Sequence, residues 1–279
     1  MRRDLLVTVT VMGSATFLAG WSVAAGAAPS PAYNWSGLYL GASAGVSAQS
    51  NPAAFAYPTG GTAGSIQFNT NGAPFRDASP TPFSAYDALP TAAVPYGPLI
   101  GTVDAGVNYQ SNAIVFGLEG DASLFGPSKY TFTGDNGDEV FSASGGMQSL
   151  FTLRPRIGVA IDKLLLYGTG GLAFGEAKFD SSLHLGDAGK GIGTADWSGS
   201  NSAWKTGFTV GGGAEYAVNN KLSLKFEALY YNLGSIDLTA AGSGFTNDPT
   251  PAPLGASSYT GHMDLQGTIA RVGVTFHLQ

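Results

Sequence analysis

Cysteine is absent from this chain of 279 residues, there are only three histidines, and Lys, Arg, Asp and Glu together make up 11% of it. Without cysteine there is neither a disulfide nor a thiolate ligand. The histidines, His184, His262 and His277, lie far apart in the sequence, without the close spacing typical of a transition-metal site. We therefore predict no metal site. Beyond residue 27 no apolar run reaches 18 residues, so any further membrane span has to consist of strands.

The beginning of the chain has the pattern of a secretory signal peptide. Arg2 and Arg3 precede an apolar stretch from Leu5 to Trp21, and small residues follow up to Ala28. A charged start, an apolar core and a small-residue cleavage site define such signals. We predict cleavage after Ala27, which assigns 1–27 to the signal peptide and 28–279 to the mature protein. Polar and glycine residues within the stretch disfavour the alternative, a permanent membrane anchor.

The mature part contains eight stretches in which apolar residues alternate with polar or small ones. In the seventh, Leu222, Leu224 and Phe226 alternate with Ser223 and Lys225. A period of two places alternate side chains on opposite faces of a strand. The pattern predicts an all-β protein, an eight-stranded antiparallel up-and-down transmembrane β-barrel. The predicted strands are 35–46, 99–110, 114–123, 151–159, 166–174, 205–216, 222–231 and 270–277.

The connections between these strands alternate in length. Short, turn-favouring segments lie at 110–112, 162–163 and 218–221, and long extracellular loops are predicted at about 48–97, 125–147, 179–203 and 234–261. With an even number of strands, both termini lie on the short-turn side, which is periplasmic in bacterial outer membranes. The predicted localisation is therefore the bacterial outer membrane. Outward aromatic residues form two belts, as expected at the two membrane interfaces: Phe151, Phe174, Phe208 and Tyr230 near the loops, and Tyr109, Tyr216 and Phe276 near the turns.

Charged residues concentrate on the face predicted to line the lumen. Five acids and five bases fall there, so the interior is predicted to be neutral and self-paired, whereas the loops hold ten acids and three bases. A soluble β-sandwich would not require its polar face to balance in sign. An eight-stranded barrel is just wide enough for its own side chains to fill, so these residues predict a plugged lumen. The predicted network is Asp104, Glu119, Asp121, Arg154, Arg156, Lys205, Glu215, Lys225, Glu227 and Arg271.

Several segments resemble a known family. Residues 35–41, 154–158, 166–175, 211–217 and 224–231 are similar to the outer-membrane-protein β-barrel family, which includes outer membrane immunogenic proteins and opacity-type porins. The resemblance implies an eight-stranded outer-membrane barrel and no reaction. Pro155 stands where the family usually has glycine, and predicts a bulge or a local gap in the strand pairing. The chain ends shortly after Phe276, which we expect to replace the usual terminal aromatic residue in recognition by the barrel-assembly machinery.

Three short motifs imitate other functions. Residues 168–173 match a dinucleotide-binding pattern, but strand-like alternation follows where a helix would have to begin, so lumen glycines explain them better and no cofactor is predicted. Ser43 lies in a G-x-S-x-G pattern, but within a strand rather than at the sharp turn that a hydrolase requires. Residues 135–139 have the oxygen density of a calcium site, but a solvated turn around Gly137 is the commoner explanation of such a segment.

The first hypothesis for function is a structural outer-membrane surface barrel and not an enzyme. Its loops would serve as antigenic and envelope contacts, with outer-membrane lipid, lipopolysaccharide and a host or phage surface as partners and no nucleic acid. The alternative is a narrow porin-like channel for small solutes. A third hypothesis, a membrane-embedded acyl hydrolase, requires a Ser–His pair near the outer leaflet, where only His184 and His262 are expected.

Overall fold

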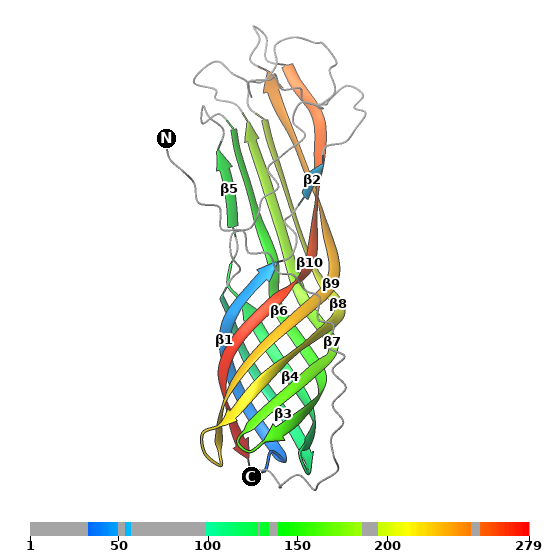
Figure 1. Ribbon diagram of the computed structural model, residues 1–279. Helices are drawn as coiled ribbons and strands as arrows, with labels where there is room; N and C mark the ends of the chain where they lie inside the picture. Colours follow the sequence, from blue (N-terminus) through cyan, green and yellow to red (C-terminus); the bar gives the residue numbers. More distant parts are fainter. Residues whose placement is uncertain are drawn as a thin grey trace, which may run out of the picture.

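The computed structural model describes residues 33–49, 54–56, 99–127, 129–133, 139–185, 195–246 and 252–278, and every regular element in them is a strand (Figure 1). No helix in this part of the chain is long and apolar enough to cross a membrane. The predicted signal peptide, most of 48–97 and the acidic side chains at 135–139 lie outside the described residues. The strands are β1 (Gly37–Gln49), β2 (Ala54–Ala56), β3 (Leu99–Ser111), β4 (Ile114–Phe125), β5 (Lys129–Thr133), β6 (Glu139–Ile161), β7 (Leu164–Leu185), β8 (Ala195–Ala217), β9 (Leu222–Thr246) and β10 (Ala252–Leu278).

Eight of the strands form a closed antiparallel ring. Their order is β1-β3-β4-β6-β7-β8-β9-β10, and β1 pairs with β10 from Leu38↔Leu278 to Gln49↔Gly267, which closes the barrel. The short strands β5 and β2 pair with β6 and β10. Two of the tight connections have a residue with positive φ, Asn112 at 54° and Asp162 at 52°, as short hairpins require. The predicted up-and-down barrel is confirmed.

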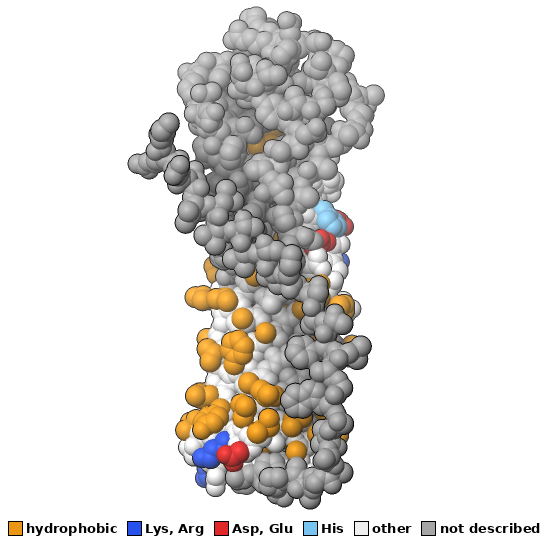
Figure 2. Space-filling model, viewed as in Figure 1, with side chains coloured by type: hydrophobic (Ala, Val, Ile, Leu, Met, Phe, Trp, Pro, Cys, Tyr) orange, Lys and Arg blue, Asp and Glu red, His pale blue; other side chains and the backbone are white. Residues whose placement is uncertain are grey.

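The outer face of the barrel is apolar. Phe226 is 56% exposed and Leu172 71%, whereas Ser223 and Glu227 on the alternate positions of β9 are fully buried. Figure 2 shows that hydrophobic side chains gather over the lower part of the face in view. Soluble monomers rarely expose a contiguous apolar patch larger than a few hundred Å². The outward face is therefore the one that contacts membrane lipid, as the alternation predicts.

Five strands are longer than a membrane requires. A transmembrane strand needs about 9–11 residues; β1, β3 and β4 have 12–13, but β6 to β10 have 22–27. Much of 125–147, 179–203 and 234–261, predicted as loops, therefore continues as strands and rises beyond the barrel (Figure 1). The prediction of loops is wrong in these segments because they are rich in Ser, Gly, Ala and Thr, a composition that is also typical of loops. We call residues 139–149, 175–185, 195–203, 233–246 and 252–265 the extension.

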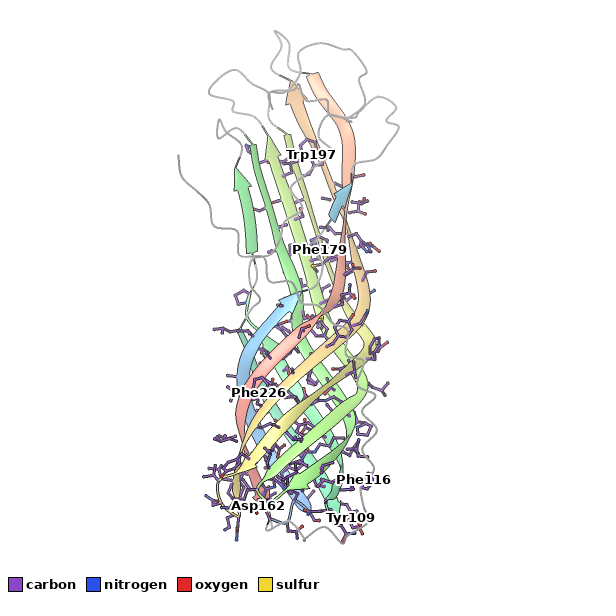
Figure 3. The ribbon with its side chains drawn as sticks, in the orientation of Figure 1. Tyr109, Phe116, Asp162, Phe179, Trp197 and Phe226 are labelled. Atoms are coloured by element: carbon purple, nitrogen blue, oxygen red, sulfur yellow. The ribbon has the colours of Figure 1, made fainter. Side chains whose placement is uncertain are left out.

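The two faces exchange character where the extension begins. On β7 the outward residues change from Leu172 and Phe174 to Glu176 and Lys178. The inward residue Phe179, labelled in Figure 3, is buried. An outward aromatic group lies at this boundary: the rings of Phe174 and Trp204 stack with centroids 4.7 Å apart. Aromatic rings at the junction of apolar and polar surface mark a membrane interface. The extension therefore has the apolar interior and polar exterior of a structure in water.

Pro155 interrupts the sheet as predicted. Pairing between β6 and β7 runs to Leu153↔Leu172 and resumes at Arg156↔Thr169 without a change of register. Proline has no N–H to donate, and the Thr169 hydroxyl donates to the Pro155 carbonyl at 3.0 Å. The result is a local gap rather than a bulge.

Candidate functional site

The lumen is filled by three layers of side chains, and the first closes the short-turn end. Trp35 is fully buried there among inward residues that include Leu165 and Tyr167. Its backbone N–H donates to Gln110 Oε1 at 2.7 Å, and its ring meets that of Tyr33 edge-on at 4.7 Å. The sequence assigns Trp35 to the first strand. Instead, the segment before β1 folds into the barrel opening, because the aromatic ring has more apolar surface to bury inside than along the rim.

The second layer is charged and has Glu119 on β4 as one centre. Its Oε1 accepts from Arg154 Nη2 at 2.6 Å, and its Oε2 accepts from Lys225 Nζ at 2.7 Å. Arg156 Nη1 lies 3.3 Å from the same Oε2, and the Tyr39 hydroxyl donates to it at 2.8 Å. All these side chains are buried. Bonds to ionised groups are the stronger class of hydrogen bond, so Glu119 holds three strands besides its own.

Glu227 on β9 is the second centre of this layer. Arg271 of the neighbouring strand β10 binds it through both Nε and Nη2, with the Nε–Oε2 distance at 2.8 Å. Arg154 Nη1 approaches from across the lumen to 3.3 Å from Oε1, and Tyr167 donates to Oε1 at 3.0 Å. Because β7 and β8 separate β6 from β9 in the ring, the Arg154–Glu227 contact bridges the lumen rather than following its wall.

The remaining members connect to these centres. Arg154 Nη2 also lies 2.8 Å from Asp121 Oδ2, and Arg156 Nη1 lies 2.8 Å from Glu215 Oε1 on β8. Asp104 Oδ2 is 3.4 Å from Lys225 Nζ. Small residues make room for these large side chains: a Cβ at Gly106 would collide with the Tyr39 ring. The layer therefore fills the cross-section with side chains that are held by several partners each.

Lys205 does not belong to this network, contrary to the prediction. It is half-buried, pairs in register with Gly175 and forms no ion pair with the described residues. It lies ten residues before Glu215 on β8, and each residue advances a strand by about 3.3 Å. The ammonium group of Lys205 is therefore too far along the barrel axis to reach the carboxylates of the charged layer. The other nine predicted residues are brought together. These nine residues are four bases and five acids, so the charged layer has a formal net charge of −1, whereas the sequence predicts a neutral lumen.

The third layer is apolar and lies above the charges, where the barrel continues into the extension. Its inward side chains are buried and form one cluster. The sequence indicates this layer only indirectly, because its members belong to inward strand positions, to segments predicted as loops, or, like Leu150, Leu233 and Met263, to residues outside both. They are Ile100, Met147, Leu150, Ala173, Ala177, Phe179, Leu229, Tyr231, Leu233, Ile236, Leu238, Met263, Leu265 and Ile269, with Phe125 and Ala203 packed against them.

The other sequence motifs do not form reactive sites in the described part of the chain. Ser43 lies within β1, on the lumen side, whereas His184 and His262 face outward from the extension and pair with Asp196 and Asp237. Residues 168–173 lie within β7, with no helix after the glycines. No group of three or more His, Asp or Glu suited to a metal ion occurs among the described residues.

His262 offers a test of the extension in solution. Its Nδ1 is 2.6 Å from Asp237 Oδ1 on β9, and this hydrogen bond raises the pKa of His262 above 6.5. Because the pKa of His262 is higher in the folded than in the unfolded protein, its protonation stabilises the fold at pH values below the unfolded-state pKa. This stabilisation is lost as the pH rises through the folded-state pKa. We expect an NMR titration of the refolded barrel to give His262 a pKa above 6.5, and Asp237→Asn to lower it. An unchanged titration in Asp237→Asn would contradict the pairing.

Comparison with known proteins assigns the family. The outer membrane protein beta-barrel domain matches residues 14–277, which is most of the chain. The chain belongs to this family. A 31 kDa outer-membrane immunogenic protein of Brucella melitensis is 33% identical over 227 residues, covering 78% of this chain and 80% of that protein. The family resemblance inferred from the sequence is thereby confirmed.

Two further similarities are more limited. A 22 kDa outer membrane protein of Rhizobium leguminosarum is 33% identical over 141 residues, which is 49% of this chain and 54% of that protein. Among solved structures, the outer membrane protein OprG from Pseudomonas aeruginosa aligns with 89% of this chain and 99% of its own, at 12% identity and a TM-score of 0.38. The family and its relatives in Brucella and Rhizobium support an outer-membrane location for this chain.

Proposed function

We propose that this protein is a structural outer-membrane surface barrel with a closed lumen and no enzymatic activity. The observation that carries the proposal is the charged layer, in which Arg154 contacts carboxylates on β4 and β9 and so bridges the lumen. Apolar layers lie on either side of it. Three successive layers of packed side chains among the described residues support a lumen that is closed to solutes.

The extension is the part proposed to make contacts outside the cell. Short turns are periplasmic in bacterial barrels, and this supports an orientation with both termini in the periplasm and the extension at the cell surface. Its outward residues are polar, among them Lys178, Asp180 and His262. Such a surface is suited to act as an antigen and to contact lipopolysaccharide or a host or phage surface.

Conductance in a planar bilayer tests the closed lumen. We expect the refolded mature protein to give no steady current, and Trp35→Ala to give none either, because the charged layer remains closed after the first layer is weakened. A heat-modifiable band in SDS gels provides the control that folded barrel is present. A stable open channel in the parent protein would contradict the proposal and favour the alternative, a narrow channel for small solutes.

A further inference from the structure

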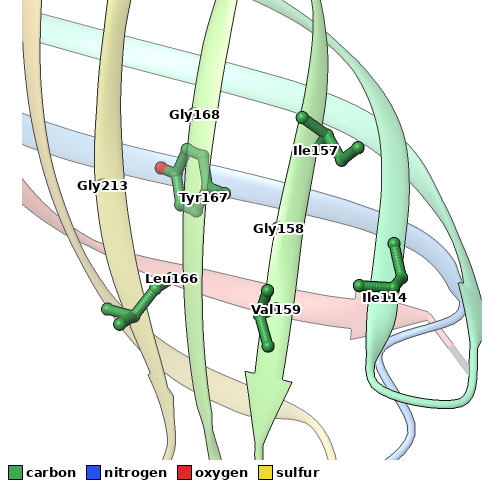
Figure 4. A pocket seen from close by; sticks show the side chains of 8 residues that line it. All are labelled: Ile114, Ile157, Gly158, Val159, Leu166, Tyr167, Gly168 and Gly213. Carbon is green, nitrogen blue, oxygen red and sulfur yellow. The ribbon is translucent and has the colours of Figure 1, made fainter. Parts of the chain in front are cut away.

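The lipid-facing surface has a groove of about 420 Å³ near the short-turn end of β4, β6 and β7. Its walls are the side chains of Ile114, Ile157, Val159 and Leu166, and the backbone at Gly168 forms part of its floor (Figure 4). Ile114, Ile157, Val159 and Leu166 are exposed on the membrane side of the barrel. The groove is thus a recess in the surface that faces acyl chains.

The barrel itself does not account for the glycine at the floor of this groove. Gly168 is exposed, its φ lies outside the positive range, and a Cβ there would meet nothing closer than the Gly211 carbonyl oxygen at 4.0 Å. It therefore does not serve a narrow lumen, as the sequence suggests for this motif. Glycine weakens a strand interior and often marks a place where another molecule approaches the backbone closely.

The occupant has to be apolar at this depth. A recess without partner atoms loses dispersion contacts along its whole lining, so filling it is favourable. A second copy of the barrel fits less well, because a two-fold interface brings the same patch together, and two recesses facing each other would stay unfilled. A flexible acyl chain can enter the recess.

The nearby turn offers a partner for the head of such a lipid. Lys163 is exposed in the β6–β7 turn directly before Leu164 of β7, and the Ala217 N–H donates to its carbonyl at 2.9 Å, which ties this turn to the end of β8. Lys221 lies in the next turn, so the short-turn connections carry two lysines and one aspartate, Asp162. Lysine near a membrane surface attracts anionic lipid.

We propose that this groove binds one acyl chain of a glycerophospholipid from the short-turn-side leaflet, with its phosphate at Lys163. The chain lies over Gly168 between the side chains of Leu166 and Ile157. Because the lipid contacts the outside of the barrel, this site is independent of the closed lumen.

Native mass spectrometry of the refolded barrel with phosphatidylglycerol tests the site. We expect the parent protein to keep one lipid as the detergent concentration is raised, and Gly168→Leu, which fills the groove from its floor, to weaken retention about tenfold. Gly168→Ala should have a smaller effect in the same direction, and it covers the case in which the leucine variant does not fold. Lys163→Gln should also weaken retention, by removing the phosphate contact.

Gly101→Leu is the matched control. Gly101 on β3 is also exposed, and a Cβ there would have nothing within 4 Å, but it does not line the groove. Its leucine variant should retain lipid like the parent. Equal retention in Gly168→Leu and Gly101→Leu would overturn the proposal, as would a dimer in the parent that Gly168→Leu alone dissociates. Unchanged retention in Lys163→Gln would overturn the assignment of the phosphate to Lys163.

Discussion

Phe226→Arg is expected to prevent stable insertion of the barrel into a membrane. Phe226 is 56% exposed in the middle of the lipid-facing part of β9 (Figure 3). An arginine at the midplane of a lipid-facing strand costs about 2–4 kcal/mol. Refolding into lipid vesicles should give little heat-modifiable protein, and the urea midpoint of the folded fraction should fall.

Thr239→Arg on the same strand is the control for this experiment. Thr239 also faces outward, but in the extension, beyond the aromatic boundary at Phe174 and Trp204. Because the surface there is polar, the same new charge should change stability by no more than about 0.5 kcal/mol. If Thr239→Arg impaired insertion as strongly as Phe226→Arg, the position assigned to the membrane edge would be wrong.

Arg154→Met is expected to lower the free energy of unfolding by about 3–5 kcal/mol, the usual cost of removing one partner from a buried ion pair. Arg154 is fully buried and contacts Glu119, Asp121 and Glu227. The layer already has one acid in excess, so loss of a base leaves three carboxylates with fewer partners. Denaturant titration of refolded barrels measures the effect, and Glu119→Gln should cost less because it restores the balance of charge.

Lys205→Met serves as the comparison for Arg154→Met. Lys205 is half-buried on β8 and forms no ion pair with the described residues. Its replacement should therefore change the free energy of unfolding by no more than about 0.5 kcal/mol. In a lumen filled with water, Arg154 would behave like an exposed partner, worth about 1 kcal/mol or less. Similar small effects of both substitutions would therefore argue against the packed charged layer.

The alternation in the sequence is sufficient to predict the barrel and its two faces. Leu222 to Phe226 alternate so regularly with Ser223 and Lys225 that only one face can meet lipid, and the structure exposes that face. Charges are just as informative, because the cost of a charge in lipid restricts Glu119, Arg154 and Glu227 to the inside. Pro155 is predictable for the same local reason, since it lacks the N–H that the strand pairing needs.

Only the tertiary structure decides what these faces meet. Trp35 has the inward parity of the first predicted strand, but β1 begins only at Gly37, and the Trp35 ring fills the opening of the barrel, a space that does not exist until the ring of strands forms. Lys205 has the inward parity of the network but the wrong height, which depends on the stagger between strands. The extension keeps the period of two while its apolar side turns from lipid to the interior. The period of the apolar residues and the positions of the charges are local properties of the chain, so the sequence by itself determined which face of each strand meets lipid. The height of a side chain in the lumen, its contact partners and its burial depend on strands far apart in the sequence, so only the closed barrel decided them.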